Sequence, residues 1–342
     1  MPRELWALSP EKMEIREYEA PQPGLGELLV RSEYAACKHG TEMAAVKGYA
    51  RARGTFDPQL LLHLQGQEPA EPGPVRVGNM FVGTIIAAGP EVKGLSVGGR
   101  ILAHGPFREI HLVREDHCWK MPAGPSWKSA VCLDPADFAL AAIRDGNVRV
   151  GDALAAFGMG AIGLMVVQIA KLSGAHPIVA VEPLANRRQV AEACGADLVL
   201  DPGECDVGLE IKEATGGRGV DVAIEYSGSV HALQTALRSV AFGGNVVAGA
   251  YPPPYGLGLD LGAEAHLNIP NIIFSRACSE PNREHPRWDE PRILATCWRL
   301  LIEGKLSGED IVTPVVPFED LVTEYPKIAS DPGSNIKLGA TF

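Results

Sequence analysis

The chain has 342 residues, of which 46% are hydrophobic, and its formal net charge at pH 7 is −11. This length can form two domains with separate cores, and the net negative charge argues against binding to nucleic acid or to anionic membranes. No apolar run reaches the roughly 18 residues that span a bilayer, and the amino-terminal residues lack the apolar core of a signal peptide. The seven cysteines include no Cys-x-x-Cys pair, which predicts reduced thiols and a cytoplasmic location.

The amino-terminal third predicts a mainly β region, because short apolar runs alternate there with proline and glycine. The expected strands are residues 4–8, 13–19, 27–35, 82–88 and 101–103. The segment 54–78 is rich in proline and glycine and predicts a long surface loop, a kind of segment that often carries function. Residues 126–147 have a helical pattern and lead into the next region.

The most specific motif is Gly-x-Gly-x-x-Gly at Gly158, Gly160 and Gly163. An apolar strand at 153–157 precedes it and a helix-length run at 161–173 follows it. In this context Gly158 would make the tight turn, Gly160 would admit a pyrophosphate to the backbone, and Gly163 would let the helix pack closely. The first helical residues, Ala161 and Ile162, would offer free N–H groups to the phosphates. The motif therefore predicts a dinucleotide site.

An acidic residue follows at the expected distance. A second apolar strand, 176–181, ends at Glu182, which lies 19 residues after Gly163. A carboxylate there can accept the ribose hydroxyls and repel a 2′-phosphate, which favours NAD. Arg187 would lie beside the adenosine or be an ordinary surface charge. Because Arg187 and Arg188 could also accommodate a 2′-phosphate, NADP remains possible.

Strands and helices alternate after residue 152, which predicts a parallel sheet covered by helices on both faces. The further expected strands are 198–200, 220–225, 245–250 and 271–275, and a helix follows at 291–304. Ligands of such sheets bind beyond the carboxyl ends of the strands. This position singles out Ser227, Gly249 and Tyr251 as further cofactor contacts.

Together these pieces resemble the medium-chain dehydrogenase/reductase superfamily. The segments that carry the resemblance are 26–43, 78–101, the glycine motif, 219–228 and 242–251. The resemblance implies an α/β protein, with a GroES-like β domain and a Rossmann domain that has a doubly wound parallel sheet. It implies that both chain ends form the GroES-like domain. We therefore expect that domain at 1–147 and 285–342, and the Rossmann domain at 148–284.

The match is strongest to the alcohol, polyol and threonine dehydrogenases, in which His39 aligns with a zinc-binding thiolate. The zinc enzymes also have a His-Glu pair where this chain has Asn79 and Met80, and a structural zinc lobe of four cysteines that is missing here. A catalytic zinc needs three good ligands and an open position. We therefore expect no metal, although a residual site formed by Cys37, His39 or Asp134 stays open.

Without zinc, alcohol oxidation needs another acceptor for the hydroxyl proton. We expect His39 to be the general base, Thr41 to bridge the alcohol to it, and Asn79 to donate to the developing carbonyl oxygen. Asp134 would orient His39. In the alternative interpretation, His39 is a polar residue in a vacated site and Asp134 is the N-cap of a helix that begins near Pro135.

The expected function is nicotinamide-dependent interconversion of a secondary alcohol and a ketone on a polyol, a sugar-like compound or another small hydroxylated molecule. The alternatives are a zinc-free enone or quinone reductase and a catalytically silent nucleotide-binding protein. We also expect a homodimer, because family members often pair the strand equivalent to 271–275 across a two-fold axis. The apolar run 269–274 would need cover as an exposed sheet edge.

Overall fold

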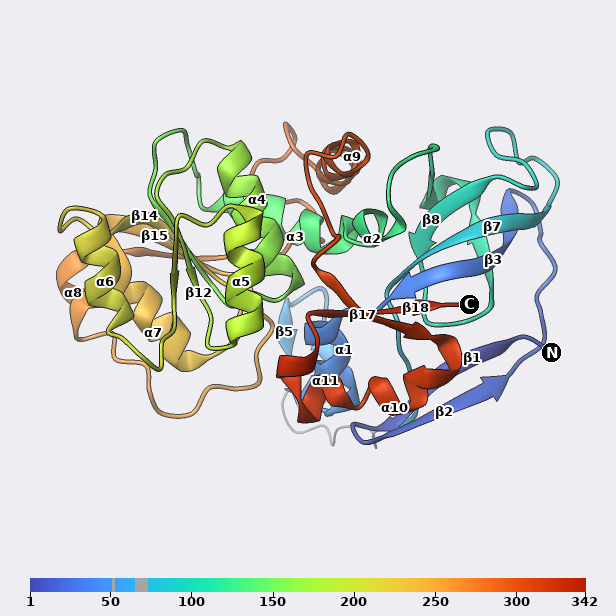
Figure 1. The fold of residues 1–342 in the computed structure, drawn as a ribbon, viewed down its shortest axis with the longest axis horizontal. Coiled ribbons are helices and arrows are strands. Elements are labelled where there is room, and N and C mark those ends of the chain that lie inside the picture. The colour runs from blue at the N-terminus through green and yellow to red at the C-terminus, as the bar shows by residue number, and fades with distance from the viewer. Residues whose placement is uncertain (51–52, 65–72) are drawn as a thin grey trace. The chain divides into compact units, whose positions relative to one another are not determined.

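A computed structural model describes residues 1–50, 53–64 and 73–342. The described chain forms two compact units. The first unit contains Met1–Trp127 and Val312–Phe342, so both ends of the chain build it, and the second contains Lys128–Ile311. In Figure 1 the blue and the red ends of the chain share the first unit, and green to orange segments form the second.

The first unit is built mainly from two sheets. One has the order β2-β1-β6, and the other has the order β10-β8-β7-β3-β18-β17, with β9 also paired to β3. The strands are β1 (Arg3–Ser9), β2 (Lys12–Glu17), β3 (Glu27–Ala36), β6 (Val75–Arg76), β7 (Met80–Ala88), β8 (Arg100–His104), β9 (Ile110–Arg114), β10 (Cys118–Lys120), β17 (Val312–Pro317) and β18 (Lys337–Thr341). The last strand of the chain, β18, pairs antiparallel with the end of β3. It therefore lies beside the residues that lead from β3 into the first helix, α1 (His39–Val46).

Short elements complete the first unit. They are α1 (His39–Val46), β4 (Phe56–Asp57), β5 (Leu62–His63), the 3-10 turns Glu115–His117, Phe318–Asp320 and Pro332–Ser334, and the short helices α10 (Leu321–Glu324) and α11 (Lys327–Ser330). The expected loop 54–78 thus contains a small hairpin of β4 and β5 and the strand β6. Its residues 65–72 lie outside the described part of the chain.

The second unit contains a six-stranded parallel sheet with the order β13-β12-β11-β14-β15-β16. The strands are β11 (Leu154–Phe157), β12 (Ile178–Val181), β13 (Leu198–Leu200), β14 (Val220–Glu225), β15 (Val240–Ala248) and β16 (Asn271–Phe274). The strand order reverses between β12 and β14, on either side of β11. The structure therefore has the doubly wound sheet that the alternating pattern predicted.

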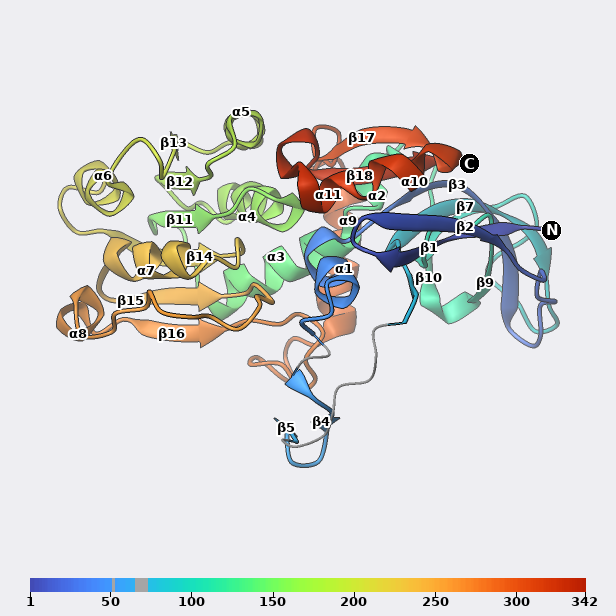
Figure 2. The ribbon, with the colours of Figure 1, turned by 90° about the horizontal axis from the view of Figure 1, so that it is seen from below.

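Helices cover both faces of this sheet, as Figures 1 and 2 show. One side carries α3 (Leu133–Asp145), α4 (Ala161–Leu172), α5 (Ala185–Cys194) and α9 (Glu290–Ile302), and the other carries α6 (Val207–Ala214), α7 (Val230–Ser239) and α8 (Glu264–Asn268). The short helix α2 (Trp127–Ala130) crosses the boundary between the units. Because α3 packs against both α4 and α9, the second unit extends beyond the expected range 148–284.

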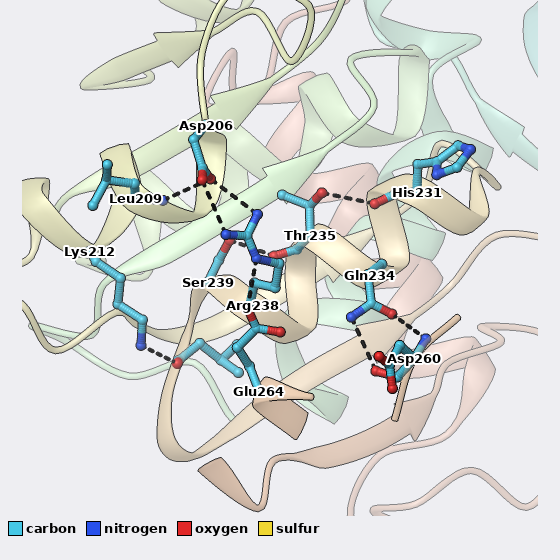
Figure 3. Close-up of polar contacts among 11 residues, drawn as sticks. Asp206, Leu209, Lys212, His231, Gln234, Thr235, Arg238, Ser239, Asp260 and Glu264 are labelled. Atoms are coloured by element: carbon cyan, nitrogen blue, oxygen red, sulfur yellow. Dashed lines mark hydrogen bonds and ion pairs between the residues drawn. The ribbon is translucent and has the colours of Figure 1, made fainter. Parts of the chain in front are cut away.

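Arg238 links the three helices that cover the face of the sheet opposite α4. Arg238, near the end of α7, makes two bonds of 3.1 Å to the carboxylate of Asp206 and one of 2.9 Å to Glu264. Asp206 is the N-cap of α6 and accepts the N–H of Leu209, while Glu264 is the first residue of α8 (Figure 3). In the described chain, no helix combines the length and apolar character needed to cross a membrane.

Candidate active site

The glycine turn joins β11 to α4. Gly158 has a φ of +88°, and a Cβ there would lie 2.7 Å from the backbone nitrogen of Ser227. A Cβ on Gly163 would lie 1.9 Å from the carbonyl oxygen of Gly158, so both positions require glycine. A Cβ on Gly160 would meet no protein atom within 4 Å. Gly160 is the N-cap of α4, followed by Ala161 and Ile162, so the turn leaves open space at the positive end of the helix.

Glu182 is fixed against this turn. It directly follows β12, whose last residue, Val181, pairs with Phe157 of β11. One carboxylate oxygen accepts the N–H of Met159 at 2.7 Å and the other accepts the N–H of Leu184 at 3.1 Å. The side chain is only 3% exposed. Since each oxygen has a second lone pair, the carboxylate can still accept ribose hydroxyls.

The two neighbouring arginines have different surroundings. Arg188 is bound to the protein, because its Nη1 lies 2.7 Å from Asp201 and 2.8 Å from each of the carbonyl oxygens of Glu182 and Pro183. Burial lowers the pKa of Arg187, while the charge of Glu182 raises it. Arg187 therefore lies near the carboxylate, and Arg188 is a weaker candidate for a 2′-phosphate contact than the sequence suggested.

A buried carboxylate that the sequence analysis did not select lies at the end of β14. Glu225 is 1% exposed, and its Oε1 accepts the N–H and the hydroxyl of Ser227, both at 2.5 Å, and the N–H of Gly228 at 2.9 Å. Burial raises the pKa of Glu225, and these donors lower it. The carboxylate holds Ser227 against Gly158. The signal in the sequence was an acidic residue at a strand end directly before a Tyr-Ser-Gly turn.

Gly249 and Tyr251 follow β15 at the same edge, because β14 and β15 pair in register up to Glu225 and Ala248. The ring of Tyr226 packs on Gly249, where a Cβ would lie 2.4 Å from it, and its hydroxyl donates to the carbonyl of Phe138 at 3.0 Å. Tyr251 is 48% exposed. The predicted cofactor residues of the second unit therefore gather at one edge of its sheet.

The first unit places Thr41 and Asn79 on separate segments. Thr41 is exposed on the first turn of α1. Asn79 directly precedes β7, and its backbone is held on both sides, by the carbonyl of Ala36 at 3.0 Å and the N–H of Gly105 at 2.9 Å. Its Nδ2 is buried and has no acceptor among the described residues. A buried donor without an acceptor is costly and calls for an explanation.

His39 is the first residue of α1, and its Nε2 accepts the backbone N–H of Leu338 at 3.1 Å. Because a backbone N–H can only donate, the proton of the neutral ring is on Nδ1 while this bond holds. The Nε2 lone pair is therefore already used, and a base role for this nitrogen would require the bond to break. The sequence did not reveal this contact, because Leu338 lies almost at the other end of the chain.

Asp134 belongs to the second unit, so its expected role as a partner of His39 stays a prediction. The N-cap interpretation is wrong. The helix α3 begins at Leu133, its N-cap is Cys132, and Asp134 is a buried residue of its first turn. A carboxylate in that turn is favoured by the partial positive charge of the helix N-terminus.

A second carboxylate, Glu42, binds the backbone directly before His39 and directly before Asn79. Glu42 accepts the N–H of Lys38 at 2.5 Å, the N–H of Gly78 at 3.0 Å and the hydroxyl of Tyr325 at 2.6 Å. The nearby Lys337 is 2% exposed, and its ammonium donates to the carbonyl of Cys37 at 2.6 Å. The backbone around the candidate substrate residues is thus held by a buried polar network.

The side chains at the expected zinc positions fit zinc poorly. Cys37 is fully buried, with no exposed surface. His39 already uses Nε2, and Met80 lies in the core with no exposed surface. In the parts of the chain that the structure describes, no three His, Cys, Asp or Glu side chains group as metal ligands.

The chain is similar to known dehydrogenases. The family described as zinc-binding dehydrogenase matches residues 161–278. The D-guloside 3-dehydrogenase of Escherichia coli (strain K12) is 42% identical, and the alignment covers 99% of this chain and all of that protein. The (R,R)-butanediol dehydrogenase of Bacillus subtilis (strain 168) is 31% identical over 74% of this chain and 77% of its own length.

Solved structures show the same fold. A putative zinc-binding dehydrogenase from Sinorhizobium meliloti 1021, bound to NADP, has a TM-score of 0.79 at 20% identity, and the match covers 100% of this chain and 99% of that one. An alcohol dehydrogenase from E. coli CFT073, complexed with NADH, has a TM-score of 0.78 at 19% identity with the same coverage. The full-length relative, the sheet order and the glycine turn show that this chain is a dehydrogenase that belongs to the medium-chain dehydrogenase/reductase superfamily.

Proposed function

We propose that the protein oxidises a secondary alcohol of a sugar-like or polyol substrate to a ketone, with NAD as the hydride acceptor and without a catalytic zinc. The observation that carries the proposal is the buried Nδ2 of Asn79, which has no acceptor among the described residues. A substrate oxygen would satisfy this donor. The full-length relative, a D-guloside 3-dehydrogenase, supports a glycoside with a free ring hydroxyl as the first substrate to test.

The preference for NAD follows from Glu182. Its buried carboxylate is held by Met159 and Leu184, so it cannot easily turn away from an adenosine ribose. Two ribose hydroxyls can donate to it, whereas a 2′-phosphate would bring negative charge beside it. Because Arg188 is bound to Asp201, it is poorly placed to offset that repulsion.

The chemistry on the substrate side would depend on neutral groups. When hydride leaves the carbinol carbon, the oxygen gains carbonyl character and the hydroxyl proton must leave. Asn79 would donate to that oxygen, in place of a metal that polarises it. Thr41, which is exposed on α1, would pass the proton to solvent. His39 would receive the proton only if its bond to Leu338 were exchanged.

The proposed assembly is a homodimer that forms through β16, and the proposed location is the cytoplasm. The strand β16 is the edge of its sheet, and two of its apolar side chains, Ile272 and Phe274, are exposed. All seven cysteines are free thiols, which supports a reducing compartment. The proposed partner is otherwise only the small-molecule substrate.

Cofactor reduction tests the function. Purified protein should reduce NAD with glycosides or polyols that carry a secondary hydroxyl, and Asn79→Leu should lower kcat/KM by about 100-fold, the scale for one oxyanion-type donor, with an unchanged Kd for NAD. Turnover of enones but not ketones would instead support a reductase of activated double bonds. Tight cofactor binding without any turnover would support a silent binding protein.

A further inference from the structure

We propose that Tyr325 and Glu42 form a positioning pair that holds the two segments carrying His39 and Asn79 at the spacing needed by a substrate oxygen. Neither side chain needs to touch the substrate in this arrangement. The inference rests on the proposed function for its kinetic consequences. The pair itself is defined by hydrogen bonds within the first unit and can be tested without a substrate.

The Glu42 carboxylate accepts hydrogen bonds from three segments of the chain. Its Oε1 accepts the N–H of Lys38, the residue before His39, and its Oε2 accepts the N–H of Gly78, the residue before Asn79. The third donor is the Tyr325 hydroxyl, 2.6 Å from Oε2. One carboxylate thereby fixes the backbone next to both candidate substrate residues.

Tyr325 brings the carboxy-terminal segment into this arrangement. It directly follows α10, it has no exposed surface, and its hydroxyl donates to Glu42. The same terminal segment supplies Leu338, which bonds His39, and Lys337, which bonds the carbonyl of Cys37. The carboxy-terminal segment therefore helps to hold the backbone and side chains around His39 in place.

The pair can perform this task only while Glu42 is ionised. A carboxylate accepts all three donors, whereas the protonated acid must itself donate and would lose one of these bonds. Burial raises the pKa of Glu42, and the Tyr325 hydroxyl, the Lys38 and Gly78 N–H groups and the charge of Lys337 lower it. Among the described residues, the Cys37 thiol is a further titratable group close to Glu42.

These contributions determine in which direction the Tyr325→Phe variant should shift the pH dependence of kcat/KM. Tyr325→Phe removes one donor that favours the ionised form, so the pKa of Glu42 rises further. The acid limb of the kcat/KM profile should then move to higher pH. At the pH optimum kcat should fall by on the order of tenfold, because misplaced groups reduce turnover strongly, while the KM for NAD stays the same. Glu42→Gln should lower kcat at every pH and lose this acid limb.

The matched control is Tyr18→Phe. The Tyr18 hydroxyl also donates at 2.6 Å, to the carbonyl of Ile110 in the same unit, but on a segment distant in sequence from α1. Both variants keep the aromatic ring. Tyr325→Phe loses the bond to Glu42, and Tyr18→Phe loses the bond to the Ile110 carbonyl together with the bond that its hydroxyl accepts from the Ile110 N–H at 3.0 Å. A merely structural role predicts similar kinetics in both, whereas the positioning role predicts altered kcat and pH profile only for Tyr325→Phe. Equal profiles in the two variants would overturn the proposal.

Hydrogen–deuterium exchange provides a readout that needs no substrate. Tyr325→Phe and Glu42→Gln should accelerate amide exchange in a peptide that contains Gly78 and Asn79, and Tyr18→Phe should not. If the protein turned over no alcohol, the proposed function would fail, and faster exchange confined to the first two variants would still support the pair. Unchanged exchange in both variants would remove its structural basis.

Discussion

Gly160 is the residue at which cofactor binding can be separated from folding. Its neighbours Gly158 and Gly163 are required by the turn itself, but a Cβ on Gly160 meets no protein atom. We expect Gly160→Val to fold with a normal melting temperature and to lose NAD affinity by at least about 100-fold, because the new side chain occupies the space for the pyrophosphate. Calorimetric titration measures this affinity. Gly158→Val should instead lower the melting temperature, and normal NAD binding by a folded Gly160→Val would refute the site.

The position of a single residue was predictable where local spacing determines it. Glu182 follows the glycine motif at a set distance, and the structure places it against Met159. Glu42 could not be interpreted in this way, because one of its three donors, Tyr325, is 283 residues away. The bond from the Leu338 N–H to His39 spans 299 residues. Because His39 Nε2 accepts this bond, that nitrogen is not available as the expected base while the bond holds. Long-range contacts of this kind leave no pattern in a single sequence.

At the scale of elements, apolar runs between turn residues predicted the parallel strands of the second unit well. The expected strands 198–200 and 220–225 agree with β13 and β14, since the strands of a parallel sheet that helices cover on both faces are rich in apolar residues. The segment 54–78 was expected to be a loop throughout, yet it contains the β4–β5 hairpin. Two-residue strands are too short to produce an alternating pattern. The N-cap of α3 was also misplaced, because Cys132 caps the helix without a side-chain bond.

The link between α6, α7 and α8 should have a modest, salt-dependent effect on stability. Arg238, Asp206 and Glu264 have side chains that are 36%, 47% and 39% exposed. Arg238→Ala should therefore lower the free energy of unfolding by only about 1 kcal/mol, the upper range for exposed pairs, and leave NAD affinity unchanged. Urea unfolding at low and high salt checks this, because added salt screens the wild-type pairs. If Arg238→Ala lowered the free energy of unfolding equally at low and high salt, the effect would come from lost packing and not from lost charge pairs.

At the scale of the whole molecule, the open edge of the parallel sheet predicts self-association. The edge strand β16 exposes 41% of Ile272 and 75% of Phe274, and an apolar sheet edge favours pairing with a second copy. Light scattering at micromolar concentration should give a dimer. Phe274→Asp should shift the equilibrium toward monomer, and Phe242→Asp, an exposed site on the neighbouring strand, is the control. A wild-type monomer would contradict the proposed assembly.

We propose that this dehydrogenase oxidises its alcohol with neutral side chains in place of zinc. The residues at the family's zinc positions, Asn79 and Met80, are weak zinc ligands, and His39 uses Nε2 to bind Leu338. The most direct test is elemental analysis of the purified enzyme combined with NAD reduction before and after treatment with a chelator. We expect zinc far below one per chain and undiminished turnover in chelator. Stoichiometric zinc, with activity that chelation abolishes and added zinc restores, would contradict it.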